Sequence, residues 1–266
     1  MSKSSLIGII IGWSIVFVSI RLATDNVLMF WDLNSFILVL IGPYFAMLIA
    51  YSASDVHLAN KKWLSIFKLY KDSSISYKDE VGRFVRWAYI TQKNGLQGLE
   101  NDAMTTVGDD DPFLKYGVEL VISGYTGNEV REILKESAFS AYQRAGRPID
   151  VLNNIGSNAP AFGMAGTLIG LVVMLGNMGA DPAAIGTGMA VALITTFYGV
   201  MSARLIYLPA GINLTSRSDD TLFRNLLITE SLVLLAERKS PRYIQDKLNA
   251  FLDPSQHFLI DRDMQR

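Results

Sequence analysis

The chain has 266 residues, a formal net charge of −1 at pH 7 and no cysteine. Half of its residues are hydrophobic and only 18% are charged, whereas an average soluble chain carries about 25% charged residues. This composition excludes a disordered protein, disulfides, thiol catalysis and cysteine-based metal centres, and the net charge gives no electrostatic reason to expect nucleic-acid binding. With a mean hydropathy of +0.26, the chain is expected to be a membrane protein with a soluble part.

Four apolar runs predict transmembrane helices, at residues 6–20, 33–50, 155–178 and 185–203. A helix needs about 20 apolar residues to cross a bilayer. The first run is short, but Leu22 and Ala23 extend it, and the Arg21 side chain can reach the membrane surface. A cleaved signal peptide is the alternative for this run. It is disfavoured because Arg21 occupies a position where a cleavage site needs small, uncharged residues.

Basic residues set the expected orientation. Residues 51–154 hold thirteen Lys and Arg and the tail after Pro209 holds eight, whereas the connectors 24–32 and 179–184 hold none. The positive-inside rule then places both termini and the long middle segment in the cytoplasm. The expected domains are the first two transmembrane helices, a cytoplasmic helical domain, the last two transmembrane helices and a cytoplasmic helical tail, at 1–50, 51–154, 155–212 and 213–266.

The soluble segments show helical periodicity. Residues 79–93 carry apolar side chains at helical spacing, and the following Asn94-Gly95 is typical of a helix end. Asp111-Pro112 predicts a helix start, because Asp caps free N–H groups and Pro fits the first turn. Ser240 is expected to cap a further helix in the tail. No strand-like alternation stands out, so the fold class is predicted to be all-α, a polytopic membrane protein with four transmembrane helices and a helical cytoplasmic domain.

The predicted transmembrane helices lack Asp, Glu, Lys and His in their middle. A proton or sodium pathway through a membrane usually needs an ionisable carboxylate. If the chain conducts cations, a partner must therefore supply that group. Asp32 is the only acidic residue that directly adjoins a span. It either caps the second helix or attracts cations at the entrance of a pathway, and the sequence leaves both roles open.

Small residues recur along the third and fourth predicted helices. They follow the pattern small-x-x-x-small, which lets two helices approach closely. Examples are Gly166-x-x-x-Gly170, Gly188-x-x-x-Ala192 and Gly199-x-x-x-Ala203. We therefore expect these faces to pack against one another.

Three threonines lie among these small residues. Thr167 is about midway along the third helix, and Thr195 and Thr196 are about midway along the fourth. Because the two helices run in opposite directions, the three hydroxyls are expected at similar depth. Their oxygens can replace part of the hydration shell of Na⁺, so an ion pathway is predicted here, with transient Na⁺ binding at Thr167 and Thr196. The alternative is that each hydroxyl only bonds a carbonyl of its own helix.

Pro160 and Pro209 lie near the cytoplasmic ends of the same two helices. Each removes a helical hydrogen bond and permits a kink, which either simply bends the helix or serves as a hinge for conformational coupling. An enzyme is not expected, because no nucleophile–base pair, P-loop or G-x-S-x-G motif is present. No resident cofactor is expected either.

The third and fourth helices resemble a known family. The stretches APAFGMAGTLIGLVVMLGNM (159–178) and AIGTGMAVALITTFYGV (184–200), followed by Leu208-Pro209, are similar to the MotA/PomA family of flagellar stator A subunits. The order of two spans, a soluble middle, two spans and a helical tail extends the resemblance over nearly the whole chain. The tail sequence SPRYIQDKLNAFL (240–252) is also similar to that family.

The resemblance implies partners and a mechanism. Several A subunits, thought to be five, surround two MotB/PomB-type B subunits in the bacterial inner membrane. Each B subunit carries a peptidoglycan-binding domain and one membrane helix with an essential aspartate, which fits the missing carboxylate. Flux of Na⁺ or H⁺ then turns the A ring around B, and its cytoplasmic part pushes on the rotor protein FliG. Membrane lipids are the remaining partner, and nucleic acid is not one.

Individual residues match the family in part. Pro160 and Pro209 match its two functional prolines, and Lys93 and Glu100 match charged positions that face the rotor. Where the family often has Arg before that Lys, this chain has Gln92. The resemblance therefore implies a rotor contact that depends on Lys93, Glu100 and the nearby basic residues Arg83 and Arg86, although such charges otherwise indicate a solvated helix face.

The resemblance is strongest to sodium-driven, PomA-type members. Asp32, Thr167 and Thr196 match them better than proton-driven ones. Three alternatives stay open: a proton-driven MotA subunit with structural threonines, an ExbB/TolQ-like proton-channel energiser, which usually has three spans, and a membrane scaffold without flux. The sequence does not fix the ring stoichiometry, the direction of rotation or the activation mechanism.

Overall fold

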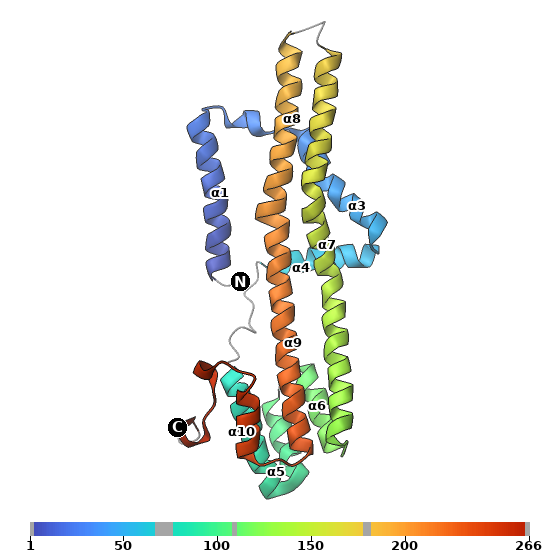
Figure 1. Cartoon of the computed structure of the whole chain (residues 1–266). Coiled ribbons are helices and arrows are strands. Elements are labelled where there is room, and N and C mark those ends of the chain that lie inside the picture. The colour runs from blue at the N-terminus through green and yellow to red at the C-terminus, as the bar shows by residue number, and fades with distance from the viewer. Residues whose placement is uncertain (1–2, 67–76, 108–110, 178–181, 264–266) are drawn as a thin grey trace. The chain divides into compact units, whose positions relative to one another are not determined.

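The computed structural model describes residues 3–66, 77–107, 111–177 and 182–263. Helices and no strands occur in these ranges, in agreement with the predicted all-α class (Figure 1). The chain forms two compact units. The first unit comprises Met1–Tyr70 and Ala145–Arg217, and the second comprises Lys71–Arg144 and Ser218–Arg266.

The first unit contains the apolar helices. Its elements are helices α1 (Lys3–Ala23), α2 (Leu33–Phe36), α3 (Gly42–Ala50), α4 (Ala53–Ser65), α8 (Pro182–Ser202) and parts of α7 (Gly127–Gly176) and α9 (Leu208–Ala236), with a 3-10 turn η1 (Val27–Phe30) and π-helical turns η2 (Ile37–Ile41) and η4 (Ala203–Tyr207). Among the described residues, three stretches are long and apolar enough to cross a membrane, namely Val27–Ala50 and segments within Gly127–Gly176 and Ile185–Ala236.

The first predicted span corresponds to a shorter apolar helix, Ile7–Ala23. The count of four transmembrane helices therefore remains a prediction. The second predicted span is one continuous path of α2, η2 and α3, in which Pro43 occupies the first turn of α3. The predicted end of the third span at residue 178 lies outside the described residues.

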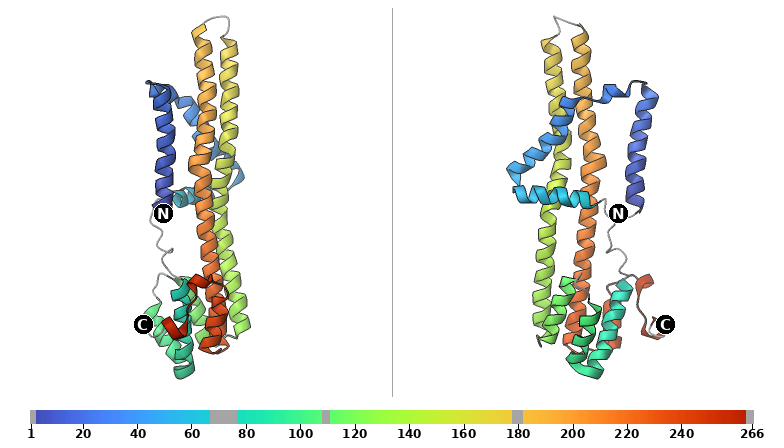
Figure 2. Two further views of the ribbon diagram at one scale, coloured as in Figure 1. Left: turned by 60° about the vertical axis from the view of Figure 1, so that its left-hand side comes forward. Right: turned by 180° about the vertical axis from the view of Figure 1, so that it is seen from behind.

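The core of the first unit joins α3, α4, α7 and α9. Its side chains are mostly aliphatic and at most a few per cent exposed; they include Met47, Val56, Ile149, Leu152, Ile155 and Leu214. Beyond this core, α7 and α8 lie side by side in each view (Figure 2).

The second unit contains α5 (Tyr77–Thr106), α6 (Pro112–Ile122), α10 (Pro241–Asn249) and the remaining parts of α7 and α9, followed by η5 (Pro254–Gln256) and α11 (Ile260–Asp263). Three predicted helix limits are confirmed. Gly95 has φ 68°, which interrupts α5 at the expected place. Asp111 accepts a hydrogen bond from the Leu114 N–H at 3.1 Å, and Ser240 accepts one from the Tyr243 N–H at 3.3 Å.

The second unit has a separate hydrophobic core. Phe84 and Trp87 of α5 meet edge to face with ring centroids 5.2 Å apart, and both are fully buried. Buried side chains from the other four helices surround them, among them Leu114, Val118, Leu134, Ile228, Leu232, Ile244 and Leu248. Because α5, α6 and α10 pack against one another in this core, the backbone positions of the charged residues on their outer faces are fixed.

Candidate functional site

The interface between α7 and α8 is formed by backbone contacts at glycines. A Cβ atom on Gly163 would lie 3.0 Å from the Thr195 carbonyl oxygen, and one on Gly199 would lie 2.8 Å from the Ala159 carbonyl oxygen. Gly170 would likewise meet backbone atoms of α8 at 2.9 Å. The predicted close-packing faces are therefore confirmed, because no side chain larger than hydrogen fits at these positions without moving a helix.

This close approach brings two threonines into contact. The Thr167 and Thr196 hydroxyl oxygens lie 2.5 Å apart across the interface, and both side chains are half-buried. Thr167 also lies within hydrogen-bond distance of two carbonyls, at 2.8 Å from Ala192 on α8 and 3.2 Å from Gly163 on its own helix. The prediction that Thr167 and Thr196 share one depth is confirmed for these two residues.

Thr195 belongs to a different environment from its neighbour. Its side chain is 1% exposed, and its hydroxyl lies 2.9 Å from the Val191 carbonyl and 3.0 Å from the Ala192 carbonyl, both on α8. Its methyl group is in contact with Gly166 of α7. The three predicted hydroxyls therefore separate into an inter-helix pair and one group that bonds its own helix, as the alternative interpretation expected for Thr195.

The hydroxyl pair is a neutral, oxygen-lined site. Thr167, Thr196 and the Ala192 carbonyl offer oxygen atoms, which hard cations such as Na⁺ prefer. Within the ranges that the structure describes, no group of three or more His, Cys, Asp or Glu residues could hold a metal ion. The site can therefore give a cation part of a coordination shell and no compensating charge.

Asp32 caps α2. Its Oδ2 accepts hydrogen bonds from the Ser35 N–H at 2.7 Å and the Ser35 hydroxyl at 2.5 Å. The Asp32 N–H donates to the Tyr198 hydroxyl at 3.4 Å, and that hydroxyl donates to the Phe30 carbonyl at 2.5 Å. A role at the entrance of an ion pathway stays a prediction for Asp32.

Tyr198 is a residue that the sequence reasoning missed. It lies two residues after Thr196 on α8 and links that helix to the segment around Asp32. The sequence does contain a signal for this contact, since Tyr198, whose ring carries a hydroxyl, follows shortly after Thr195 and Thr196. It was overlooked because a tyrosine near the end of an apolar helix is ordinarily assigned to the membrane interface.

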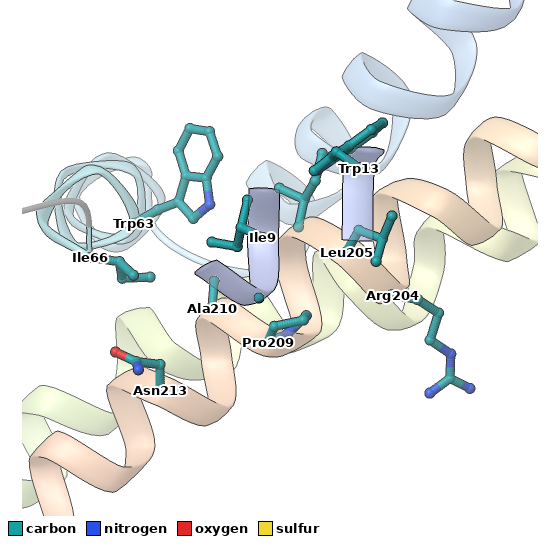
Figure 3. A pocket seen from close by; sticks show the side chains of 11 residues that line it. Ile9, Trp13, Trp63, Ile66, Arg204, Leu205, Pro209, Ala210 and Asn213 are labelled. Carbon is teal, nitrogen blue, oxygen red and sulfur yellow. The ribbon is translucent and has the colours of Figure 1, made fainter. Parts of the chain in front are cut away.

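The two prolines sit at different structural features. Pro160 lies inside α7, beside the crossing with Gly199. Pro209 is the second residue after the π-helical turn η4, and a proline at this point removes a backbone donor and favours such an irregular turn. Pro209 also lines a cavity of about 440 Å³ with Trp13 of α1 and Trp63 of α4 (Figure 3). A hinge at either proline stays a prediction.

The predicted rotor-binding residues lie on the two segments of α5. The kink at Gly95 separates Arg83, Arg86 and Lys93 from Glu100. Lys93 is exposed, and Glu100 lines a groove of about 520 Å³ between α5 and α6. Arg83 pairs with Glu80 at 3.5 Å.

Arg86 has a structural partner in the same helix hairpin. Its guanidinium lies 2.9 Å from Asp102 Oδ2, which also accepts a hydrogen bond from Trp87 Nε1 at 2.8 Å. Burial opposes ionisation of Asp102, but hydrogen bonds from Trp87 and Thr106 and the charge of Arg86 outweigh it and hold the pKa of this carboxyl below its usual value. Arg86 thus helps to fold the two segments of α5 onto each other.

A buried ion pair in the second unit was also missed. Arg224 of α9 lies 3.1 Å from Glu80 Oε1 and 2.5 Å from Asp111 Oδ2, and the Glu80 side chain is fully buried. These contacts join α9 to the beginning of α5 and to the cap of α6. Glu80 and Arg224 are 144 residues apart, so no local pattern could have paired them.

Known proteins resemble this chain over almost its whole length. Motility protein A of Borreliella burgdorferi is 31% identical over 257 residues, covering 96% of this chain and 95% of the relative. Chemotaxis protein PomA of Vibrio alginolyticus is 30% identical over 259 residues, covering 97% and 98%. Motility protein A of Cereibacter sphaeroides is 33% identical over 263 residues, covering 96% and 97%.

The fold is likewise similar to solved structures. The flagellar MotAB stator complex of Bacillus subtilis contains a chain that matches with a TM-score of 0.85 at 23% identity, covering 96% of this chain and 97% of that one. The MotAB structure of C. jejuni matches with a TM-score of 0.84 at the same identity and coverage. Residues 107–224 match the sequence profile of the MotA/TolQ/ExbB proton channel family. Taken with the near full-length relatives, these matches establish that the chain belongs to the MotA/PomA family.

Proposed function

We propose that the chain is the A-type stator subunit of a bacterial flagellar motor and forms a cation channel with a MotB/PomB-type B subunit in the inner membrane. Its relatives are named motility protein A and PomA, and the solved structures with the same fold are MotAB complexes. The observation that carries the proposal is the Thr167–Thr196 hydroxyl pair at a glycine interface between two apolar helices.

The transported cation is Na⁺ in this proposal. Two hydroxyl oxygens and the Ala192 carbonyl supply part of a Na⁺ shell, and the aspartate of the B subunit supplies the charge. About five copies surround two B subunits, whose peptidoglycan-binding domains anchor the complex. The cytoplasmic termini and the charges of α5 face FliG, to which the ring transmits torque.

The test is swimming speed against external Na⁺ at constant ionic strength and proton-motive force. The strain carries this chain and its B partner as the only stators. Wild-type speed should rise and saturate with Na⁺. Thr196→Val, which keeps the shape and removes the oxygen, should raise the Na⁺ concentration for half-maximal speed by about tenfold, which corresponds to about 1.4 kcal/mol for one ligand. Thr196→Ser should restore the wild-type value.

A matched control separates the site from general packing. Thr215 of α9 is half-buried, and its hydroxyl bonds only the Gly211 carbonyl of its own helix, at 3.0 Å, among the contacts found in the described ranges. Thr215→Val should therefore leave the Na⁺ dependence unchanged. An equal shift in Thr196→Val and Thr215→Val would contradict a Na⁺ site at the hydroxyl pair.

A proton-driven stator is the second candidate. The observation that favours it is that Thr167 and Thr195 already bond helix carbonyls and need no cation to satisfy them. Steady swimming without Na⁺, with Thr196→Val equal to the wild type, would select this candidate. An ExbB/TolQ-like energiser or a scaffold without flux would fail to restore swimming to a strain that lacks other stators.

A further inference from the structure

Helix α1 packs loosely against the rest of the first unit. Its main contact among the described residues is with the π-helical turn η4, where a Cβ atom on Gly12 would lie 3.5 Å from the Leu205 side chain. Most of its large apolar side chains are exposed, among them Trp13 at 41% and Phe17 at 57%. The first unit therefore leaves unfilled space beside this helix.

Two hollows lie along α1. The first is the cavity of about 440 Å³ at Pro209 (Figure 3), and the second, of about 410 Å³, is lined by α1, η1, α2 and α8. Trp13 and Ile206 line both, so the two hollows adjoin each other, and we call them together the α1 groove. Its lining extends along α1 from Gly8 to Ile20, which corresponds to about 18 Å of helix.

The second hollow offers no free hydroxyl to a ligand. The hydroxyl-bearing residues of its lining are Tyr198 and Ser202, and both donate within the protein, Tyr198 to the Phe30 carbonyl at 2.5 Å and Ser202 to the Gly199 carbonyl at 3.2 Å. An ordered water needs two to four polar partners, so water is a poor occupant. The rest of the lining is apolar and rich in aromatic rings, which include Phe17, Trp31, Phe36 and Phe197.

The size of the groove excludes a further helix. A helix 18 Å long and about 10 Å across occupies on the order of 1,400 Å³, whereas the two hollows measure about 440 and 410 Å³. A slender hydrocarbon chain matches both the volume and the apolar lining. Such chains are also what surrounds a spanning helix in the hydrocarbon core of a bilayer.

The two ends of the groove differ in polarity. Arg204 and Asn213 line the end at Pro209, whereas the other end is lined by the aromatic rings. The Arg204 side chain points away from Trp63 and Ile9 (Figure 3), so its charge does not select what enters the groove. A phospholipid fits this pattern, with a chain along the aromatic end and its head group outside the groove.

We propose that the α1 groove binds one acyl chain of a membrane phospholipid, which lies against η4 and Pro209 and supplies packing that α1 lacks within its own chain. Lipid chains are as apolar as the lining, so binding is favoured by close contact with the aromatic rings and not by removal of water. The inference goes beyond the proposed stator function, because it depends on the membrane location of the first unit and not on the transported cation.

The test is quenching of tryptophan fluorescence by dibromostearoyl phosphatidylcholine, added to the purified complex of this chain and its B subunit in detergent. The chain has four tryptophans. Trp13 and Trp63 line the groove, and the fully buried Trp87 of the second unit is an unquenched reference. Trp31→Phe, introduced in every sample, removes the most exposed of the four. Quenching should saturate at a single bound phospholipid per copy of this chain.

The variants fill the groove or an equally open place elsewhere. Gly8 lines the groove, and no atom would lie within 4 Å of its Cβ, so Gly8→Phe can place a ring there. Phenylalanine also favours a helix more than glycine, so the unfolding midpoint should not fall. The phospholipid concentration for half-maximal quenching should rise by about tenfold or more in Gly8→Phe. It should stay at the wild-type value in Gly8→Ala and in Gly176→Phe, because Gly176 is equally open and lies outside the groove.

Three results would overturn the inference. Quenching that grows with the phospholipid fraction and never saturates would show only a lipid surrounding. Protection of Trp63 at every phospholipid concentration would indicate that a second copy or the B subunit covers the groove. Equal titrations of Gly8→Phe and Gly176→Phe would place the bound chain elsewhere. Failure of the wild type to restore swimming would instead reject the proposed function and leave these titrations unaffected.

Discussion

The close contact between α7 and α8 makes Gly199 a position where a single methyl group should matter. A Cβ atom there would lie 2.8 Å from the Ala159 carbonyl oxygen and 3.2 Å from the Cα atoms of Pro160 and Gly163, all on the backbone of α7. Because backbone atoms cannot rotate away, Gly199→Ala should push the helices apart until the shortest contact approaches the 3.4 Å of ordinary van der Waals packing. Overpacking of this kind costs about 1–3 kcal/mol.

Gly186→Ala is the matched control, because it adds the same methyl group to the same helix. No atom would lie within 4 Å of its Cβ. Both substitutions gain roughly 1 kcal/mol of helix propensity, so their difference isolates the steric effect. Thermal unfolding of the purified complex should give a midpoint roughly 2–12 °C lower for Gly199→Ala than for Gly186→Ala. Swimming should be impaired only in Gly199→Ala, since separation of the helices also weakens the Thr167–Thr196 contact. Equal midpoints would refute the reasoning.

Two further predictions concern the second unit. Glu80→Gln should lower its stability by about 1.5–3 kcal/mol, because it removes the charge from the buried contact with Arg224 at 3.1 Å while Arg224 keeps its contact with Asp111. Thermal unfolding compares this variant with the exposed Glu132→Gln, and equal stability of the two would contradict the prediction. The pKa of Asp102 is lowered in the folded protein, so folding favours the ionised carboxylate. The interactions of this carboxylate therefore stabilise the fold at neutral pH, and the stabilisation is lost as the pH falls through the lowered pKa. The unfolding midpoint of Asp102→Asn should therefore lie below that of the wild type at pH 7, and the difference should shrink below pH ~4, whereas a difference independent of pH would contradict the assignment.

Local signals in the sequence were sufficient for much of the fold. Gly95 interrupts α5 through its own backbone conformation. Asp111 and Ser240 each cap a helix by accepting a hydrogen bond from the N–H three residues later. These helix limits therefore depend only on residues that are close together in the sequence. The small-residue faces could be predicted for a similar reason, because a four-residue spacing fixes one side of a helix. The depth match of Thr167 and Thr196 followed from the opposite directions of the two helices.

The other features of the fold and of the site depend on contacts between different helices, which the periodicity of a single helix does not predict. Thr195 and Thr196 are adjacent in sequence, and only the rotation of α8 against α7 decides which hydroxyl crosses the interface. Arg224 of α9 pairs with Glu80 of α5 and with Asp111 at the cap of α6, and both carboxylates lie far from it along the chain. The left-handed backbone conformation of Arg238, with φ 53°, was not predicted because glycine is the usual signal for that conformation, and here the signal is absent.

The chemistry of the hydroxyl pair also explains why the proposed channel should depend on a second chain. Oxygen dipoles replace water around Na⁺, but they do not neutralise its charge, and an unpaired ion in an apolar interior costs several kcal/mol. Within the part of the chain that the structure describes, hydroxyl and carbonyl oxygens form the hydrogen bonds of this site, and no carboxylate takes part in them. The hydrogen bond between Thr167 and Thr196 is therefore the favourable state when the subunit is alone. A cation displaces it only when a carboxylate of the B subunit faces the pair, which in this proposal makes cation binding conditional on the position of the partner.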